Sequence, residues 1–562
     1  MKELLLLLLI VPLAAAVVVA LLGPRRTTAI RWISLAATLV SAAIAFTVAV
    51  NLAQKETDQA TGQAVKSPTP QTFTPSYVTR ISVLPLGPGA VQFYIGLDGL
   101  NVWLVTLTAV LMVSSVLASW HTPQVKERIN EYFAWLLLLE VGMIGLFLSF
   151  DIILFYVFFE LTLVPLFFLI GIWGGPERRH AARKFFIYTL TGSLITLLGL
   201  IGAVILVYQH RPDELTFSIP ELVQALNERF SLPVDRAYWL NVQFWLFLAL
   251  IAGFSIKVPL VPLHTWLPLA HVEAPTAGSV LLAGVLLKIG TYGYLRLCLP
   301  LAPDASLRVG VPLIGTLAVI GIIYGALTAL AQNDMKKLVA YSSVSHLGFC
   351  MLGMFALNLT GLSGSLMQMI NHGLSTGALF LLVGMLYDRY HTRQLQDYGG
   401  MGAKLKLLAC FMVFICLTSL GLPGLNGFVG ESLVFFGMFQ LWPALAVIGT
   451  AGIVLGAWYL LRLLLRIFFG PVKEPHHEGA EPVTDLNLRD LAALVPIAAL
   501  CLLIGVYPQP ILKTSERDLG VVVRILNDAA DRARALEIAA VPAAEKADQK
   551  SASTLDKGDR PR

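Results

Sequence analysis

The chain has 562 residues, of which 56% are apolar and only 13% are charged, whereas ordinary soluble domains have about 25% charged residues. So few charged side chains cannot cover so much apolar surface. The composition therefore excludes a single soluble globule, a disordered chain and a small secreted disulfide-rich protein. The formal net charge of +5 is typical of basic loops between membrane helices and does not indicate a nucleic-acid partner.

Fourteen apolar segments follow one another along the chain, and a bilayer core of about 30 Å needs about 20 apolar residues per helix. The predicted segments are 3–22, 30–52, 99–120, 132–150, 152–174, 185–208, 240–257, 277–300, 309–331, 337–358, 361–387, 405–441, 442–469 and 488–511. The first is longer than the apolar region of a cleaved signal peptide and ends at Pro24-Arg25-Arg26, so we interpret it as a membrane helix. The sequence lacks the short alternating segments of a transmembrane barrel, so the predicted fold class is an all-α polytopic membrane protein.

Two of these segments are interrupted in a similar way. The seventh runs into Val258-Pro259-Leu260-Val261-Pro262, and the twelfth is too long for one span and contains Gly421-Leu422-Pro423-Gly424. Each break is in the fourth segment of a set of five, segments 4–8 and 9–13, and an odd number of spans gives consecutive copies opposite topologies. Interrupted helices at matching positions are typical of inverted repeats. The predicted domains are 1–131 (three helices and an external loop), 132–300 and 301–470 (the two five-helix repeats), 471–512 (the last helix) and 513–562 (a polar tail).

Basic residues in alternate loops predict the orientation. One set of loops is rich in Lys and Arg and is expected in the cytoplasm: Arg25, Arg26, Lys126, Arg128, Arg178, Arg179, Arg183, Lys184, Lys336, Lys337, Arg389, Arg393, Lys404 and Lys406. The long loops 53–98 and 209–239 have three basic residues each, so these loops and both termini are expected outside. We also expect residues 53–80 to form a polar loop, the tail to be amphipathic to about Ala540, and the last twenty residues to be disordered.

The sequence predicts neither a metal site nor a bound cofactor in this chain. The five cysteines, Cys298, Cys350, Cys410, Cys416 and Cys501, lie in apolar segments without a CxxC pair. The histidines form no HExxH motif, and the adjacent His476 and His477 indicate a solvated turn. The chain also has no GxGxxG nucleotide loop.

Ionisable residues occur inside several apolar segments, where a charge costs about 2.5–3.5 kcal/mol on insertion scales. They are Glu140, Glu160, Lys257, Lys288, His346, His372 and Glu431. A structural interpretation is open for each: hydroxyls could satisfy the glutamates, the histidines could be neutral core residues, and Lys257 could extend to the surface. Arg462 and Arg466 lie near a segment end, where contact with lipid is expected. His264, His271 and Glu273 flank a proline-rich connection and are expected to be solvated.

Taken together, these buried groups predict a hydrated row of proton carriers. Burial disfavours the charged form of lysine, whereas a nearby carboxylate favours it, so a Glu–Lys pair that opens and closes can exchange a proton. Histidine titrates near neutral pH and can continue such a row. Sodium remains an alternative ion.

The motifs around these residues resemble the antiporter-like, proton-translocating subunits of respiratory complex I, and most closely their M-type (chain 4) group. The resemblance rests on FYVFFELTLVPLFFLIGIWGG, PERRHAARKFFIYTLTGS, FSIKVPLVPLHTWLPLAHVEAPTAGSVLLAGVLLKIGTYG and DMKKLVAYSSVSHLGF. It implies fourteen helices with two inverted five-helix repeats, and a pair formed by Glu160 and Lys257. It further implies a central Lys288, a link through His346 and His372, and a terminal carboxylate at Glu431.

From the resemblance we expect a multi-pass subunit of the bacterial cell membrane that translocates protons, driven by redox chemistry elsewhere. NADH and quinone would bind to other subunits, and the partners would be neighbouring membrane-arm subunits and the lipid bilayer. One alternative is a subunit of a multisubunit Na+/H+ antiporter or membrane-bound hydrogenase. A second is a membrane scaffold in which polar side chains only hold helices together.

Overall fold

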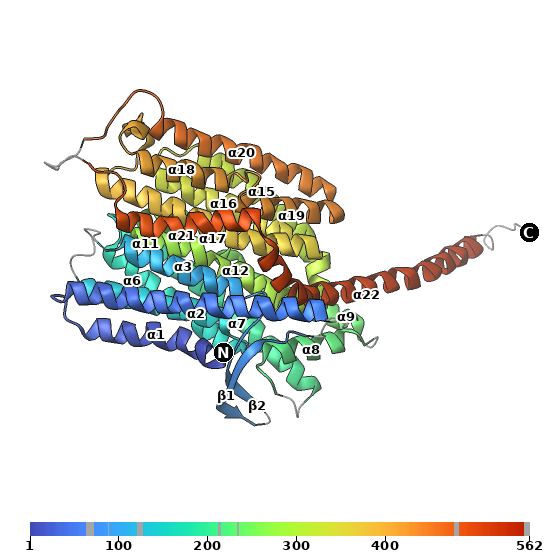
Figure 1. The fold of residues 1–562 in the computed structure, drawn as a ribbon. Helices are drawn as coiled ribbons and strands as arrows, with labels where there is room; N and C mark the ends of the chain where they lie inside the picture. Colours follow the sequence, from blue (N-terminus) through green and yellow to red (C-terminus); the bar gives the residue numbers. More distant parts are fainter. Residues whose placement is uncertain are drawn as a thin grey trace, which may run out of the picture.

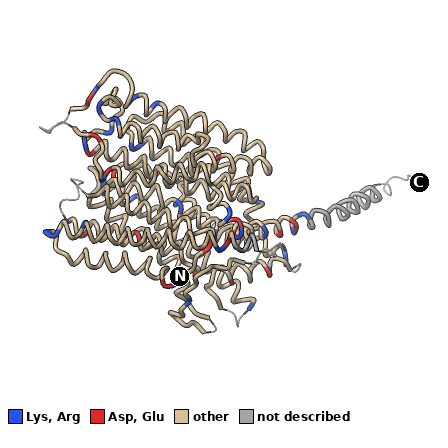
Figure 2. Tube along the Cα trace, viewed as in Figure 1, with Lys and Arg blue, Asp and Glu red and all other residues tan. Residues whose placement is uncertain are grey.

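The computed structural model is a bundle of long, roughly parallel and antiparallel helices (Figure 1). It describes residues 1–62, 72–87, 89–120, 128–211, 215–232, 235–476 and 483–555. Lys126 and His477, which the sequence places in a basic loop and a turn, lie outside the described residues. Figure 2 shows that charged residues gather mainly at the two ends of the bundle, with few between them.

The chain crosses the bundle fourteen times in its described part. Eleven crossings are helices long and apolar enough to span a membrane, and α3, α16 and the α18–α19 pair complete the set. The first three crossings are α1 (Lys2–Leu21), α2 (Thr27–Gly62) and α3 (Val102–Ala118). The last is α21 (Leu488–Val506). These results confirm the predicted fold class.

Two sets of five crossings make up the rest of the bundle. The first set comprises α4 (Ile129–Leu148), α5 (Ile152–Leu161) with α6 (Leu163–Trp173), α7 (Arg178–His210), α9 (Arg236–Lys257) with α10 (Leu267–Glu273), and the segments from α11 (Thr276–Leu281) to α13 (Leu299–Leu301). The second comprises α14 (Pro303–Ala305) with α15 (Val311–Leu330), α16 (Met335–Met354), α17 (Leu359–Tyr390), α18 (Lys406–Ser419) with α19 (Asn426–Leu441), and α20 (Pro443–Phe468). The two sets begin in opposite directions, as inverted repeats require.

The breaks predicted in the seventh and twelfth segments are present. The helix α9 ends at Lys257 and α10 starts at Leu267, while α18 ends at Ser419 and α19 starts at Asn426. The eighth crossing is also irregular, because the π-helical turns η2 (Leu282–Leu286) and η3 (Tyr294–Cys298) flank α12 (Leu287–Gly293). Single π-helical turns often mark functional sites, since they shift a helix face by one residue.

Polar caps determine where several crossings begin. The Asp151 carboxylate accepts hydrogen bonds from the amides of Ile153 and Leu154, and Asp334 does the same for Lys336 and Lys337. Such acceptors satisfy the free amides of a helix start. The short 3-10 helices η5 (Leu395–Asp397) and η6 (Met401–Ala403) lie in the connection before α18.

One end of the bundle, called the hairpin end below, has a different structure from the one predicted. In the segment expected to be a polar loop, residues 53–62 form the last turns of α2, and residues 76–80 belong to β1 (Ser76–Leu86), which pairs antiparallel with β2 (Gly89–Leu97); residues 63–71 lie outside the described part. The prediction of a loop was wrong for the described residues, because Thr79 and Ile81 of β1 pair with Ile95 and Phe93 of the second strand. The loop 209–239 likewise contains α8 (Ile219–Phe230).

The polar tail is helical over most of its length. The helix α22 (Gln509–Leu555) starts at the hairpin end and leaves the bundle there (Figure 1). It includes part of the segment expected to be disordered, so that prediction was wrong up to Leu555, and residues 556–562 lie outside the described part. Asp518 of α22 accepts a hydrogen bond from the amide of Gly99 at 2.7 Å, and Arg532 pairs with Asp304 at 3.0 Å.

Candidate functional site

Four buried ionisable side chains form a connected row across the middle of the bundle. The ammonium Nζ of Lys288 lies 2.6 Å from Nδ1 of His372. The rings of His372 and His346 are 5.8 Å apart between centroids, and Nδ1 of His346 lies 3.6 Å from Oε1 of Glu431. The row therefore runs from α12 of the first repeat through α17 and α16 to α19 of the second.

The helices around the row hold its members away from solvent. All four side chains are buried, and that of Lys288 is 0% exposed. Nζ of Lys288 also donates to the carbonyl of Ala283, within the π-helical turn η2, at 2.6 Å. When the protonated lysine donates to Nδ1 of His372, a neutral His372 carries its own proton on Nε2, which lacks a hydrogen-bond partner in the described part of the chain.

Uncharged polar side chains extend the row, and the sequence analysis did not identify them. Nε2 of Gln368 lies 3.4 Å from Oε1 of Glu431, and the hydroxyl of Tyr459 lies 3.2 Å from Nε2 of His346. Nδ2 of Asn371 donates to the carbonyl of Asn426 at 2.6 Å, at the start of α19. The sequence signal for two of them was the amide residues Gln368 and Asn371, close to His372 in an otherwise apolar segment.

Glu160 on α5 and Lys257 on α9 belong to the first repeat and lie outside the row itself. Lys257, the last residue of α9, is buried, and its ammonium group lies 4.8 Å from the ring centre of Phe159. Glu160 is half-buried and acts electrostatically on Lys257, but in the part of the chain that the structure describes no ion pair within 4.0 Å joins them. The hydroxyl of Tyr156 interacts with Glu160 and with Ser193 of α7. The pair is therefore separated in this structure.

Lys257 and Lys288 belong to adjacent helices. A Cβ built on Gly290 would lie 3.0 Å from Cβ of Lys257, so α9 ends directly against α12. Beside this contact, the hydroxyls of Ser255 and Tyr294 are 2.5 Å apart. Among the described residues, no direct hydrogen bond joins the two lysines, so a proton passing between them needs a bridging group.

Glu140 lies apart from the row. It is fully buried on α4, near Ser41 of α2, and neither of its carboxylate oxygens makes a hydrogen bond within the part of the chain that the structure describes.

Residues expected to be solvated are buried at the end opposite the hairpin. His264, His271 and Glu273 are at most 8% exposed, and the ring of His271 stacks on Phe380 at 4.5 Å. The expectation was wrong because α10 folds back into the bundle. Lys336, counted as a loop residue, is also buried and donates to the carbonyl of Ala274.

A small cavity of about 50 Å3 lies between the connection before α7, the α10–α11 break and the starts of α16 and the loop after α17. Its lining includes Gly175, Glu273, Thr276, Lys336, Tyr387 and Arg393. Polar groups line this recess, which is large enough for water.

Within the described ranges, no group of three or more His, Cys, Asp or Glu side chains could hold a metal ion. The arrangement instead consists of groups that exchange protons: lysines, histidines and a carboxylate in hydrogen-bond or near hydrogen-bond contact.

The chain is similar to known subunits of membrane complexes. Residues 149–456 match a family model described as "NADH:quinone oxidoreductase/Mrp antiporter, TM". The NADH-quinone oxidoreductase subunit M of Rhodobacter capsulatus is 43% identical over 420 residues, covering 74% of this chain and 79% of the relative.

The chain is also similar to chains of solved membrane complexes. A chain of respiratory complex I from Thermus thermophilus with bound NADH is 29% identical, with a TM-score of 0.77 and coverage of 93% of this chain and 99% of that chain. A chain of the Mrp complex from Dietzia sp. is 20% identical, with a TM-score of 0.75 and the same two coverages, 93% and 99%. At that identity, the second match shows the shared fold alone.

Proposed function

The chain belongs to the NADH:quinone oxidoreductase/Mrp antiporter family, among the M-type subunits, and from this premise we propose that it translocates protons across the membrane. It is a multi-pass, membrane-arm subunit that works beside partner subunits of an NADH:quinone oxidoreductase. NADH oxidation and quinone reduction take place on other subunits and drive the movement of protons here. No cofactor is assigned to this chain.

The observation that carries the proposal is the connected row Lys288–His372–His346–Glu431. Its members lie up to 143 positions apart in the sequence, between 288 and 431, yet consecutive members are in direct or near contact. Bringing ionisable groups together inside a membrane bundle is costly, so such groups usually mark an ion pathway.

The geometry supports a sequence of proton transfers. Lys288, while protonated, donates to Nδ1 of His372, and the imidazole can release its Nε2 proton toward His346. His346 then passes a proton to Glu431, which Gln368 and His346 hold between them.

The Glu160–Lys257 pair acts as the switch in this proposal. When the carboxylate approaches Lys257, it stabilises the ammonium form, and when it withdraws, burial favours release of the proton toward Lys288. The separated arrangement corresponds to the releasing state. A change in the neighbouring subunit would move Glu160 electrostatically.

The orientation of the chain is part of the proposal. The basic loops gather at the end opposite the hairpin, which by the positive-inside rule faces the cytoplasm. Protons then enter near the cavity lined by Glu273 and Lys336, and the hairpin end and both termini face outside.

The test is replacement of the switch residues in the assembled complex. We expect Glu160→Gln and Lys257→Met each to reduce proton pumping and coupled quinone reduction sharply, because neither variant can form the charged pair. Glu228→Gln is a matched control, since Glu228 is an exposed glutamate paired with Arg211 at the hairpin end. Near-normal pumping in either switch variant would contradict the assignment.

A second candidate function rests on the fold shared with the Mrp complex. A sodium/proton antiporter subunit would support sodium-dependent exchange in a complex that does not oxidise NADH. Purifying the native complex and measuring NADH oxidation with quinone as acceptor separates the two functions.

A further inference from the structure

We propose that Arg296 and Asp98 form a fixed-charge seal that closes the hairpin end of the first repeat to protons. The inference rests on the proposed function, because a seal matters only where a proton carrier lies behind it. It adds a role for two residues that take no part in the row described above.

The side chain of Arg296 is fully buried near the hairpin end. Its side chain is 0% exposed, and Nη2 lies 2.6 Å from Oδ2 and 2.7 Å from Oδ1 of Asp98. Its Nε donates to the hydroxyl of Tyr292 at 3.0 Å. The guanidinium is thus paired with Asp98 and kept from water, and the carboxyl of Asp518 on α22 is close enough to act on it electrostatically.

Arg296 is placed directly between Lys288 and the hairpin end. Lys288, Tyr292 and Arg296 follow one another at intervals of four residues along one crossing, and the contact of Arg296 with the Tyr292 hydroxyl persists across the π-helical turn η3. At about 1.5 Å per residue, Arg296 lies about 12 Å from Lys288 along the axis. A proton leaving Lys288 in this direction would meet the hydroxyl of Tyr292 and then the guanidinium.

Aromatic rings enclose the guanidinium. Its central carbon lies 4.5 Å from the ring centre of Phe73, 4.8 Å from that of Phe150 and 5.3 Å from that of Tyr292. Phe73 precedes the hairpin and Phe150 precedes α5, so chain segments at the hairpin end close over the charge. Rings at these distances stabilise a cation while leaving little room for a chain of water molecules.

Asp98 is itself held in place. Its Oδ1 accepts hydrogen bonds from the amides of Leu100 and Asn101 at the start of α3. The next residue, Gly99, donates its amide to Asp518 of α22, so the terminal helix lies over the loop that contains Asp98. These hydrogen bonds hold the Asp98 carboxylate in its position beside Arg296.

Such an arrangement fits a barrier better than a relay. A relay group must gain and lose a proton, whereas arginine keeps its proton throughout the range in which proteins work. A fixed positive charge in a narrow polar path repels an excess proton, and arginines exclude protons from water-conducting pores in this way. With this end closed, a proton on Lys288 can continue only along the row toward Glu431.

The test measures passive proton leak, without NADH, in liposomes containing the assembled complex. A pH gradient is imposed and its decay is followed with an entrapped pH-sensitive dye. We expect the double variant R296Q/D98N, which removes both charges together, to dissipate the gradient several-fold faster than the wild type. The double variant R211Q/E228Q is the matched control, since it removes an exposed ion pair at the same end, and it should remain tight.

The variant Arg296→Lys keeps the positive charge and loses the planar guanidinium, and we expect it to hold the gradient. Leak in Arg296→Lys would show that packing, and not charge, closes this end, and would overturn the proposal even if the double variant does not assemble. A tight R296Q/D98N complex would also overturn it, and slower pumping in that variant would instead identify an exit route. Because the readout needs no turnover, it is independent of the Glu160 and Lys257 experiments.

Discussion

Nζ of Lys288 and Nδ1 of His372 lie 2.6 Å apart, so a lysine of the first repeat and a histidine of the second share a hydrogen bond. This contact is the junction between the repeats in the proposed pathway. If protons pass through it, its two members act in series.

Serial action predicts how variants combine. We expect Lys288→Met and His372→Gln each to lower proton pumping by at least about tenfold, since a positioned acid or base typically contributes more than that. The double variant should pump protons no more slowly than the single variants, because blocking one step of a single path already stops transport along it. Pumping is measured in vesicles, with oxidation of NADH by an artificial acceptor as the control for assembly. Additive losses would contradict a common path.

The glycine before the broken helix α19 offers a test that leaves every charge in place. Gly421 has a φ of +71°, and a Cβ there would lie 2.7 Å from Oε2 of Glu431. Gly424 has a φ of +90°, with nothing within 4 Å of such a Cβ. Both Gly→Ala changes carry a backbone penalty of about 1–2 kcal/mol, because alanine is disfavoured at positive φ. Only Gly421→Ala should also displace the Glu431 carboxylate.

We therefore expect Gly421→Ala to reduce pumping clearly more than Gly424→Ala, although the two lose similar thermal stability. Melting temperature and initial pumping rate are measured on the same preparations. Equal pumping rates would show that the position of Glu431 is not critical.

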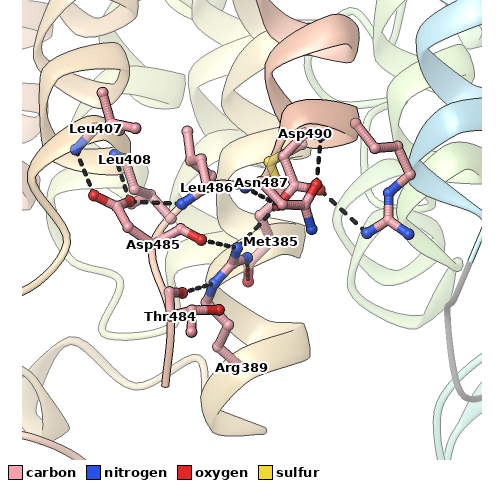
Figure 3. A network of polar contacts seen from close by, with 10 residues as sticks. Met385, Arg389, Leu407, Leu408, Thr484, Asp485, Leu486, Asn487 and Asp490 are labelled. Atoms are coloured by element: carbon pink, nitrogen blue, oxygen red, sulfur yellow. Dashed lines mark hydrogen bonds and ion pairs between the residues drawn. The ribbon is translucent and has the colours of Figure 1, made fainter. Parts of the chain in front are cut away.

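A polar network near the end opposite the hairpin ties α17 to α21 (Figure 3). Arg389 donates to the carbonyls of Thr484, Asp485 and Met385 and to the Asp490 carboxylate, with distances of 2.9–3.1 Å. The carboxylate of Asp485 in turn accepts the amides of Leu407 and Leu408 at the start of α18. One arginine thus holds three helix ends together.

Removing that arginine leaves the carbonyls of Thr484 and Asp485 without this donor, whereas the carboxylate of Asp490 keeps Arg489 at 3.3 Å. We expect Arg389→Gln to lower the free energy of unfolding by about 1–3 kcal/mol, the cost of leaving buried acceptors unsatisfied. Arg128→Gln is the control, because the pair of Arg128 with Glu131 is exposed to solvent and such pairs contribute little to stability. Thermal unfolding of the purified complex and the yield of assembled protein measure the difference. Equal effects of the two substitutions would argue against a structural role for the network.

The attachment of α22 should depend on pH. Burial and the neighbouring Asp98 carboxylate raise the pKa of Asp518 to about 8, against the opposing effects of the Gly99 amide, Arg296 and Arg517. In an unfolded chain the pKa of an aspartate is about 3.9. The protonated carboxyl is therefore favoured in the folded state, and its contribution to stability is lost as the pH rises through about 8.

We accordingly expect amide exchange in residues 509–535 to accelerate progressively as the pH rises from about 4 to about 8 and to level off above that, after correction for the intrinsic pH dependence of exchange. Asp518→Asn, which stays neutral, should remove this acceleration. An unchanged pH profile in that variant would assign the effect to another group.

The sequence by itself determined the class of protein, the crossings and the groups available for chemistry. Apolar runs such as 277–300 are long enough to span a bilayer, and a charged residue within one, such as Lys288, stands out because its burial is costly. The breaks after Lys257 and before Glu431 were also predicted, since proline and glycine interrupt helices locally. The boundaries of the five proposed domains and the roles of the individual site residues stay predictions.

Only the tertiary structure decided which of these groups meet. Hydropathy shows that a segment is removed from water, but it does not show which side chain of a distant helix lies opposite. The contact of Lys288 with His372, the burial of His271 and the pairing of Arg296 with Asp98 all join positions far apart in the chain. The hairpin was missed for the same reason, because strand pairing depends on a partner strand and not on local composition.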